Sequence, residues 1–238
     1  GKSLCYQLPA ALLPGATLVE SPLISLMHDQ LEKLHALGIT AVQLNSSLSR
    51  AEEDDAIARI AHGGKLIIFC TPERLATADF LALLAAAPPS LAVIDEAHCI
   101  SQWGHDFRPA YLDIAAALRA LGRPPVLALT ATATEDVVAD IRTQLGAPQL
   151  RVVNTGIYRA NLRYGVIQVT NAGEKHDTVL RLLRETPGTG IVYAATVKAV
   201  EELAARLQGL GESVTCYHGK LAARERKHNQ ELFMGGER

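Results

Sequence analysis

Two acidic residues, Asp95 and Glu96, directly follow the short apolar run from Leu91 to Ile94. A run of this kind predicts a buried strand, and the ligand sites of parallel sheets lie at the carboxyl ends of their strands. A carboxylate placed there can hold the Mg²⁺ that bridges two phosphates, and a second can orient and deprotonate an attacking water. We assign the first role to Asp95 and the second to Glu96. A strand end with two solvated acids is the plain alternative.

The first three residues, Gly1, Lys2 and Ser3, match the end of the phosphate-binding loop pattern GxxxxGK followed by Ser or Thr. Glycine lets backbone N–H groups approach phosphate oxygens, the lysine reaches the β and γ phosphates, and the serine hydroxyl binds magnesium. Three residues alone are a weak signal, which a surface turn explains as well. Together with the two acids downstream they predict a site for ATP and Mg²⁺. The predicted catalytic residues of this site are Lys2, Asp95 and Glu96. Its predicted nucleotide contacts are Gly1, Lys2 and Ser3, and its predicted metal ligands are Ser3 and Asp95.

The segment from Leu129 to Ala133 follows another apolar run and contains Thr130 and Thr132. Small hydroxyl residues at the end of a strand can hydrogen-bond both to the two acids and to a nucleic acid, and so link two sites. By itself, the segment is typical of a turn that starts a helix, with Thr134 as the N-cap.

The only tryptophan, Trp103, has Phe107 four residues later and Arg108 beside that phenylalanine. Gly104 and Pro109 interrupt helices, so we expect these side chains to lie on a loop. Aromatic faces stack on nucleic-acid bases without sequence preference, at about 1–3 kcal/mol per base. The residues alone favour this interpretation no more than a pair of core aromatics that fix the loop.

Short apolar runs alternate with helical patterns around these residues, which predicts an α/β fold with a parallel sheet. Ser49, with Glu52 three residues later, predicts a capping box at the start of one helix. We expect strands at Ala16–Val19, Ala41–Leu44, Leu66–Phe69, Leu91–Ile94 and Val126–Leu129. We expect helices that begin at Ser3, Leu23, Arg50, Arg74, Tyr111 and Glu135.

A connector at residues 154–164 predicts a domain boundary near Ile157, which divides the chain into residues 1–157 and 158–238. The alternation of patterns restarts after it. We expect strands at residues 190–194 and 213–217, and helices at residues 197–207 and 221–233.

The composition sets outer limits on the function. A net charge of −2 over 238 residues argues against a wholly basic nucleic-acid coat, although a local basic patch remains compatible with it. The cysteines Cys5, Cys70, Cys99 and Cys216 lie far apart without a CxxC pair, which predicts buried, reduced thiols in a cytoplasmic protein rather than a zinc site or disulfides. The sequence shows no signal peptide and no apolar stretch long enough to cross a bilayer.

The order of the segments GKSLCYQLPA, SPLISLMHDQ, TPERL, IDEAHCISQWGHDFRPAY and ALTATA resembles the RecQ family of superfamily-two DNA helicases. The resemblance runs from Gly1 to about Gly146, and the stretch from Asp95 to Tyr111 is its most specific part. It implies a RecA-like parallel-sheet motor domain followed by part of a second RecA-like domain. It further implies an ATP-dependent, 3′ to 5′ DNA helicase that acts on single-stranded and forked DNA in recombination and repair, associated with the bacterial nucleoid.

The same resemblance implies roles for further residues. In the family, the loop that carries Trp103 and Phe107 senses single-stranded DNA and couples it to ATP hydrolysis. The implied coupling residues are His98, Thr130 and Thr132, and the implied DNA contacts are Gln102, Trp103, Phe107, Arg108, Ser21, Gln30, Thr71 and Arg74. Glu20 departs from the pattern, which usually has an apolar residue there.

Two other functions stay open. An RNA helicase of the DEAD or DEAH kind shares the acidic motif but not the aromatic loop. A non-catalytic nucleic-acid-binding module, or an inert piece, is the alternative from another class. The family's adenine-recognition segment is expected before Gly1 and its arginine finger after Arg238, so we expect the isolated 238 residues to be inactive.

Overall fold

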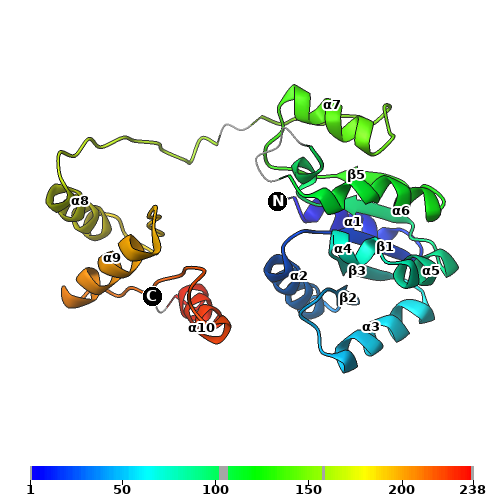
Figure 1. Cartoon of the computed structure of the whole chain (residues 1–238), viewed down its shortest axis with the longest axis horizontal. Coiled ribbons are helices and arrows are strands. Elements are labelled where there is room, and N and C mark those ends of the chain that lie inside the picture. The colour runs from blue at the N-terminus through cyan, green and yellow to red at the C-terminus, as the bar shows by residue number, and fades with distance from the viewer. Residues whose placement is uncertain (1, 102–106, 157–158, 237–238) are drawn as a thin grey trace. The chain divides into compact units, whose positions relative to one another are not determined.

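The computed structural model describes residues 2–101, 107–156 and 159–236 (Figure 1). The chain divides into two compact units, Gly1–Thr155 and Gly156–Arg238. Each unit is described by itself below.

The first unit is built on a five-stranded parallel sheet with the order β2-β3-β1-β4-β5, which confirms the predicted α/β class. Because all strands run in one direction, their carboxyl ends share one edge of the sheet. The central strand is β1, and its last residue, Glu20, pairs with Cys70 on one side and Ile94 on the other. The strands are β1 Ala16–Glu20, β2 Ala41–Leu44, β3 Leu66–Cys70, β4 Leu91–Ile94 and β5 Val126–Ala128.

The helices of the first unit alternate with these strands (Figure 1). The α-helices are α1 Leu4–Leu12, α2 Ile24–Ala36, α3 Arg50–His62, α4 Pro72–Leu75, α5 Ala78–Ala86, α6 Ile114–Ala120 and α7 Glu135–Gln144. Two short 3₁₀ helices, η1 Ala97–Ile100 and η2 Pro109–Asp113, follow β4. The predicted capping box at Ser49 and Glu52 and the predicted N-cap at Thr134 are both confirmed.

Two predicted helix starts are wrong. The helix expected from Arg74 is broken near Thr77, where the Arg74 carbonyl accepts from both the N–H and the hydroxyl of Thr77, at 3.1 and 2.9 Å. The short helix α4 therefore ends at Leu75 and α5 begins at Ala78. The helix expected from Tyr111 begins only at Ile114, since the residues from Pro109 onward form η2 first.

Apolar side chains fill both faces of the sheet, as expected for parallel strands. One face packs Val19, Ile67 and Phe69 against α1 and α2, with Tyr6 edge-on to Phe69 at 6.4 Å between ring centroids. The other face packs Leu18 and Ile68, with their neighbours, against α3, α5, α6 and α7. This two-sided burial fixes the sheet, and therefore the loops at its carboxyl edge.

The second unit contains α8 Ala172–Glu185, α9 Val197–Gly209 and α10 Ala223–Met234. The helix expected at residues 197–207 is confirmed, the one expected at 221–233 begins two residues late, and α8 was not predicted. The strands expected at residues 190–194 and 213–217 are wrong, because the described residues of this unit include no paired strand. An apolar run becomes a strand only by pairing, and here Ile191 and Tyr193 remain 62% and 90% exposed.

The four cysteines are free thiols. Cys70 and Cys99 are buried as expected, whereas Cys5 is exposed and Cys216 is half-buried. Among the described helices, none is long and apolar enough to cross a membrane.

Candidate active site

The loop after β4 brings two carboxylates to the carboxyl edge of the sheet. The Asp95 N–H donates to the Glu20 carbonyl at 2.8 Å, and the Ala97 N–H donates to the Leu129 carbonyl at 2.8 Å, so the loop is held from β1 and from the end of β5. Between these bonds, Glu96 has a left-handed backbone, with φ 47° and ψ 45°. This conformation costs a residue other than glycine about 1–2 kcal/mol. The chain leaves its strand direction at the residue predicted to be catalytic.

Lys2 and Glu96 form an ion pair across 94 positions of the sequence, with 2.7 Å between Nζ and Oε1. Lys2 lies directly before α1, and α1 packs on the sheet through Tyr6 and Ala10. The structure thus brings together the two motifs that the sequence analysis assigned to one site.

Ser3, another predicted nucleotide contact, is hydrogen-bonded to a side chain of helix α2. The Gln30 amide donates to the Ser3 hydroxyl at 3.0 Å, and the Gln7 amide donates to the Gln30 side-chain oxygen at 2.9 Å. Gln30 was expected to contact DNA, yet its side chain here is hydrogen-bonded to Ser3, the serine expected to bind nucleotide. Its contact with DNA stays a prediction.

The three residues expected to couple the sites lie in contact with one another. His98 Nδ1 lies 3.3 Å from Glu96 Oε2 and 3.0 Å from the Thr130 hydroxyl. The Thr130 hydroxyl donates to the Thr132 carbonyl at 3.0 Å and accepts from the Thr132 N–H at 3.2 Å. A chain of polar contacts therefore runs from Lys2 through Glu96 and His98 to the loop after β5.

The electrostatics of the site suit a bound cation. The pKa of Asp95 is raised, chiefly by burial and also by the negative charge of Glu96. The Glu96 N–H, Lys2 and His98 lower this pKa but do not cancel the rise. A divalent ion beside Asp95 would offset this penalty. The Ser3 hydroxyl and the Asp95 carboxylate are hard oxygen donors of the kind that Mg²⁺ prefers. The described residues contain no cluster of three or more His, Cys, Asp or Glu that could hold a metal ion.

Part of the predicted DNA-contact set falls outside the described residues, namely Gln102 and Trp103, as does Gly1 of the phosphate loop. Phe107 and Arg108 are described and half-buried. The Arg108 guanidinium donates to the Pro22 carbonyl at 3.2 Å, which ties the end of this loop to the segment after β1.

The other predicted DNA contacts are largely enclosed by protein. Ser21 and Thr71 are 3% and 8% exposed, and the Thr71 hydroxyl caps α4 by accepting from the Arg74 N–H. The Arg74 guanidinium lies 2.9 Å from a Glu53 oxygen and 3.0 Å from an Asp79 oxygen. It therefore joins α3, α4 and α5 in this structure, and its contact with DNA stays a prediction.

Glu20 is a buried carboxyl for which the sequence analysis found no role. It is fully buried, and neither carboxyl oxygen has a hydrogen-bond partner among the described residues. Burial raises the pKa of Glu20 well above its usual value; the nearby Tyr111 hydroxyl lowers it, Asp95 and Glu73 raise it further, and Arg108 lowers it. An acid at the end of the apolar run Ala16–Val19 was the only signal of this feature.

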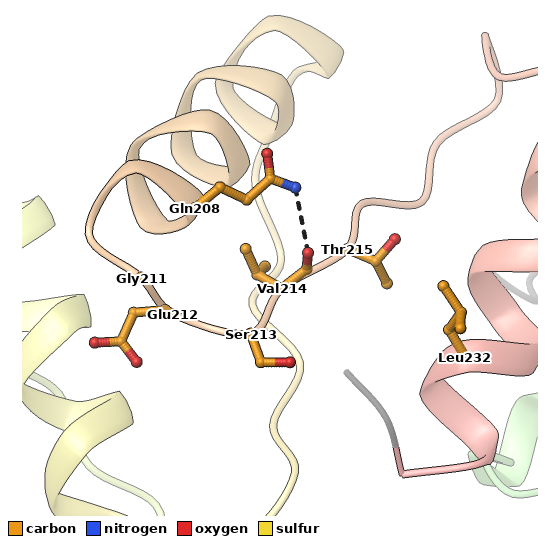
Figure 2. A pocket seen from close by; sticks show the side chains of 7 residues that line it. All are labelled: Gln208, Gly211, Glu212, Ser213, Val214, Thr215 and Leu232. Atoms are coloured by element: carbon orange, nitrogen blue, oxygen red, sulfur yellow. Dashed lines mark hydrogen bonds between the residues drawn. The ribbon is translucent and has the colours of Figure 1, made fainter.

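A pocket of about 530 Å³ lies in the second unit, and none of the residues that line it is a predicted site residue (Figure 2). Figure 2 shows the Gln208 amide, which donates to the Val214 carbonyl at 3.3 Å, on one side of it and Leu232 of α10 on the other. The nearby carboxylate of Glu212 is paired with Arg184 at 2.8 Å. We assign this pocket no role in the site.

Comparison with known proteins places these features among helicases. The sequence profile of the DEAD/DEAH box helicases matches residues 1–141. The ATP-dependent DNA helicase RecQ of Bacillus subtilis (strain 168) is 42% identical over 238 residues, which cover all of this chain and 40% of that protein. The ATP-dependent DNA helicase Q5 of Rattus norvegicus is 40% identical, over 98% of this chain and 26% of that protein. The chain thus spans less than half the length of these relatives.

Two solved structures share the fold at lower identity. Saccharomyces cerevisiae Dbp5 bound to RNA and ADP BeF3 is 20% identical with a TM-score of 0.71, over 100% of this chain and 61% of that one. Mycobacterium smegmatis helicase Lhr bound to ssDNA and AMP-PNP is 17% identical with a TM-score of 0.67, over 100% of this chain and 35% of that one. At these identities the likeness shows the fold alone.

Proposed function

We propose that this chain, which belongs to the DEAD/DEAH box helicases, is of the RecQ kind and forms the ATP-hydrolysing motor of a DNA helicase. The observation that carries the proposal is the ion pair between Lys2 and Glu96, at 2.7 Å. It joins a phosphate-binding lysine and an acid at the end of β4, as ATP hydrolysis requires.

In the proposed reaction, Lys2 leaves Glu96 for the β and γ phosphates when ATP binds. Glu96 then orients a water and takes its proton. The water oxygen bonds to the γ phosphorus while the bond from that phosphorus to the bridging oxygen breaks, which leaves phosphate and ADP. Gly1 and Ser3 complete the phosphate contacts. Ser3 and Asp95 would hold Mg²⁺, which would neutralise phosphate charge. His98, in contact with both Glu96 and Thr130, reports the state of Glu96 to the loop after β5.

DNA is the proposed nucleic acid. The RecQ-type relatives with about 40% identity are named DNA helicases, whereas the RNA-bound relative supports the fold alone at 20% identity. The aromatic pair Trp103 and Phe107 suits stacking on single-stranded bases, and Arg108 lies beside it. We propose single-stranded and forked DNA as substrates and 3′ to 5′ movement, with the RNA helicase as the alternative.

The test uses the full-length protein with Mg²⁺ and ATP on forked DNA and on an RNA duplex of equal length. We expect unwinding of the DNA with a 3′ tail, and none by Lys2→Ala, because the lost ammonium no longer binds the phosphates. Lys65→Ala is the matched control, since Lys65 is exposed and its ammonium donates to the Ala11 carbonyl, at 3.1 Å. Faster unwinding of the RNA duplex, or full activity of Lys2→Ala, would contradict the proposal.

Trp103→Ala is expected to lower DNA-stimulated ATP turnover far more than DNA-independent turnover. Loss of one stacked base weakens DNA binding by about 1–3 kcal/mol, or roughly 5- to 150-fold. ATPase titrations with single-stranded DNA measure the effect. A core role predicts a different result, namely a loss of stability of about 3–5 kcal/mol for a large buried aromatic. An equal loss of DNA-stimulated and DNA-independent ATP turnover, together with a much lower melting temperature, would therefore contradict the DNA-sensing role.

A further inference from the structure

The segments that follow β4 and β5 are joined by a further polar contact, which the proposed reaction does not use. The Ser101 hydroxyl donates to an Asp140 carboxylate oxygen at 2.7 Å. Ser101 ends η1, the short helix that begins directly after Glu96, and Asp140 lies in the middle of α7. The two residues are 39 positions apart in the sequence.

The Ser101 end of this contact is rigidly linked to Glu96. Ser101 is fully buried, and its N–H donates to the His98 carbonyl at 3.1 Å. Between Ser101 and Glu96 lie only the four residues of η1, all of them buried. Because packed interiors transmit displacements rather than absorb them, a shift at Ser101 reaches the Glu96 backbone, which already has a strained, left-handed conformation.

The Asp140 end of the contact is rigidly linked to the loop after β5, which carries Thr130 and Thr132. Helix α7 begins at Glu135, and the Thr134 hydroxyl caps it by accepting from the Val137 N–H at 3.4 Å. Thr134 lies two residues after Thr132. The turn after β5 and α7 therefore form one piece. It holds η1 through Ala97 and His98 near Glu96, and through Ser101 at the far end.

We propose that Asp140 is a positioning residue for ATP hydrolysis, which holds η1 through Ser101 and so sets the direction of the Glu96 carboxylate. This inference rests on the proposed function, because it assigns to Asp140 a part in the same reaction. A displacement of α7 moves Asp140 and Ser101 with it, and thereby changes the position of the hydrolytic carboxylate.

The experiment is a double-mutant cycle on the full-length protein with Ser101→Ala, Asp140→Ala and the double variant. Each single variant is expected to lower kcat for ATP by roughly tenfold, the effect of losing one hydrogen bond to a charged group, with little change in KM. The double variant should fall no further, since either change alone removes the contact. Asp140→Asn keeps a carbonyl acceptor in the same place and should recover most of the turnover.

Asp136→Ala is the matched control, because Asp136 is an exposed acid one turn earlier on the same helix. It should leave kcat unchanged. A lower melting temperature for Asp140→Ala with wild-type kcat would show that the contact only stabilises the fold, and additive losses in the double variant would show two independent roles. Either result overturns the inference.

The unsubstituted protein and Glu96→Gln are measured in the same series. If the unsubstituted protein does not hydrolyse ATP, the proposed function fails, and this inference with it. If the unsubstituted protein hydrolyses ATP and Asp140→Ala has the same kcat, the inference about Asp140 fails and the proposed function stands.

Discussion

Replacing Glu96 by glutamine is expected to lower ATP turnover by about 10²–10⁴-fold, the usual contribution of a general base. The amide keeps the shape of the side chain and can still accept from Lys2, but it cannot take a proton from water. Nucleotide binding should therefore be retained while the chemical step is lost. Steady-state ATPase assays together with titration of a fluorescent ATP analogue separate the two.

The control for this substitution is Glu135→Gln. Glu135 is an exposed acid in the first turn of α7, so its variant removes the same charge without touching the site. We expect it to hydrolyse ATP at the wild-type rate. Turnover of Glu96→Gln close to that of the control would show that another group accepts the proton.

Replacing Glu20 by leucine, a side chain of similar size, is expected to raise the free energy of unfolding by about 1–3 kcal/mol at neutral pH. The substitution removes a buried carboxyl whose oxygens have no hydrogen-bond partner among the described residues. The neighbouring Tyr111 hydroxyl keeps its own acceptor, because it donates to the Asp95 carbonyl at 3.1 Å. Denaturant titration of the purified variant measures the gain.

The gain from Glu20→Leu should depend on pH with a definite sign. In the unfolded chain Glu20 titrates near 4.5, whereas burial raises its pKa well above that in the folded chain. Below pH 4.5 both states are protonated; above it the folded chain keeps a proton that the unfolded chain releases. The stability of the unsubstituted protein therefore falls, by up to about 1.4 kcal/mol per pH unit, until the folded pKa is passed.

The leucine variant lacks this loss of stability. The difference in free energy of unfolding between the variant and the unsubstituted protein should therefore grow from about pH 4.5 upward. Asp95, Glu73, Arg108 and Tyr111 face Glu20, and they remain in both proteins, so their own titration largely cancels in the difference. Glu32→Leu, at an exposed position of α2, is the control, and it should show no such trend. An advantage that stays constant between pH 4 and 8 would mean that Glu20 does not titrate as its burial requires.

The sheet of the first unit could be predicted because parallel strands buried on both faces appear in the sequence as short apolar runs. Strand boundaries differ from the predicted ones where backbone pairing outweighs the polarity of a side chain. Glu20 is acidic and was excluded from its strand, yet its backbone pairs with strands on both sides and extends β1 by one residue. The second unit shows the opposite error, since its apolar runs at residues 190–194 and 213–217 have no partner strand in the described chain.

The candidate site could be predicted as far as its motifs lie at strand ends. These motifs meet at one edge of the sheet. Lys2 precedes the start of α1, whereas Glu96 and His98 follow the end of β4 and Thr130 follows the end of β5. Contacts between loops carry no such pattern. Nothing in the sequence predicts the contact of Asp140 with Ser101. Arg74 was assigned to DNA through the family resemblance, and no pattern in the sequence indicated its ion pair with Glu53 on another helix.

The uneven burial of the cysteines provides two natural labelling positions. Cys70 and Cys99 are shielded from reagents, whereas Cys5 is exposed at the start of α1 and Cys216 is half-buried in the second unit. A thiol-reactive dye would therefore favour one position in each unit without any engineered residue. Energy transfer between a donor and an acceptor at these positions would follow the separation of the two units during an ATP cycle. The same accessibility makes Cys5, three residues after Lys2, a site where alkylation can be tested for protection by bound nucleotide.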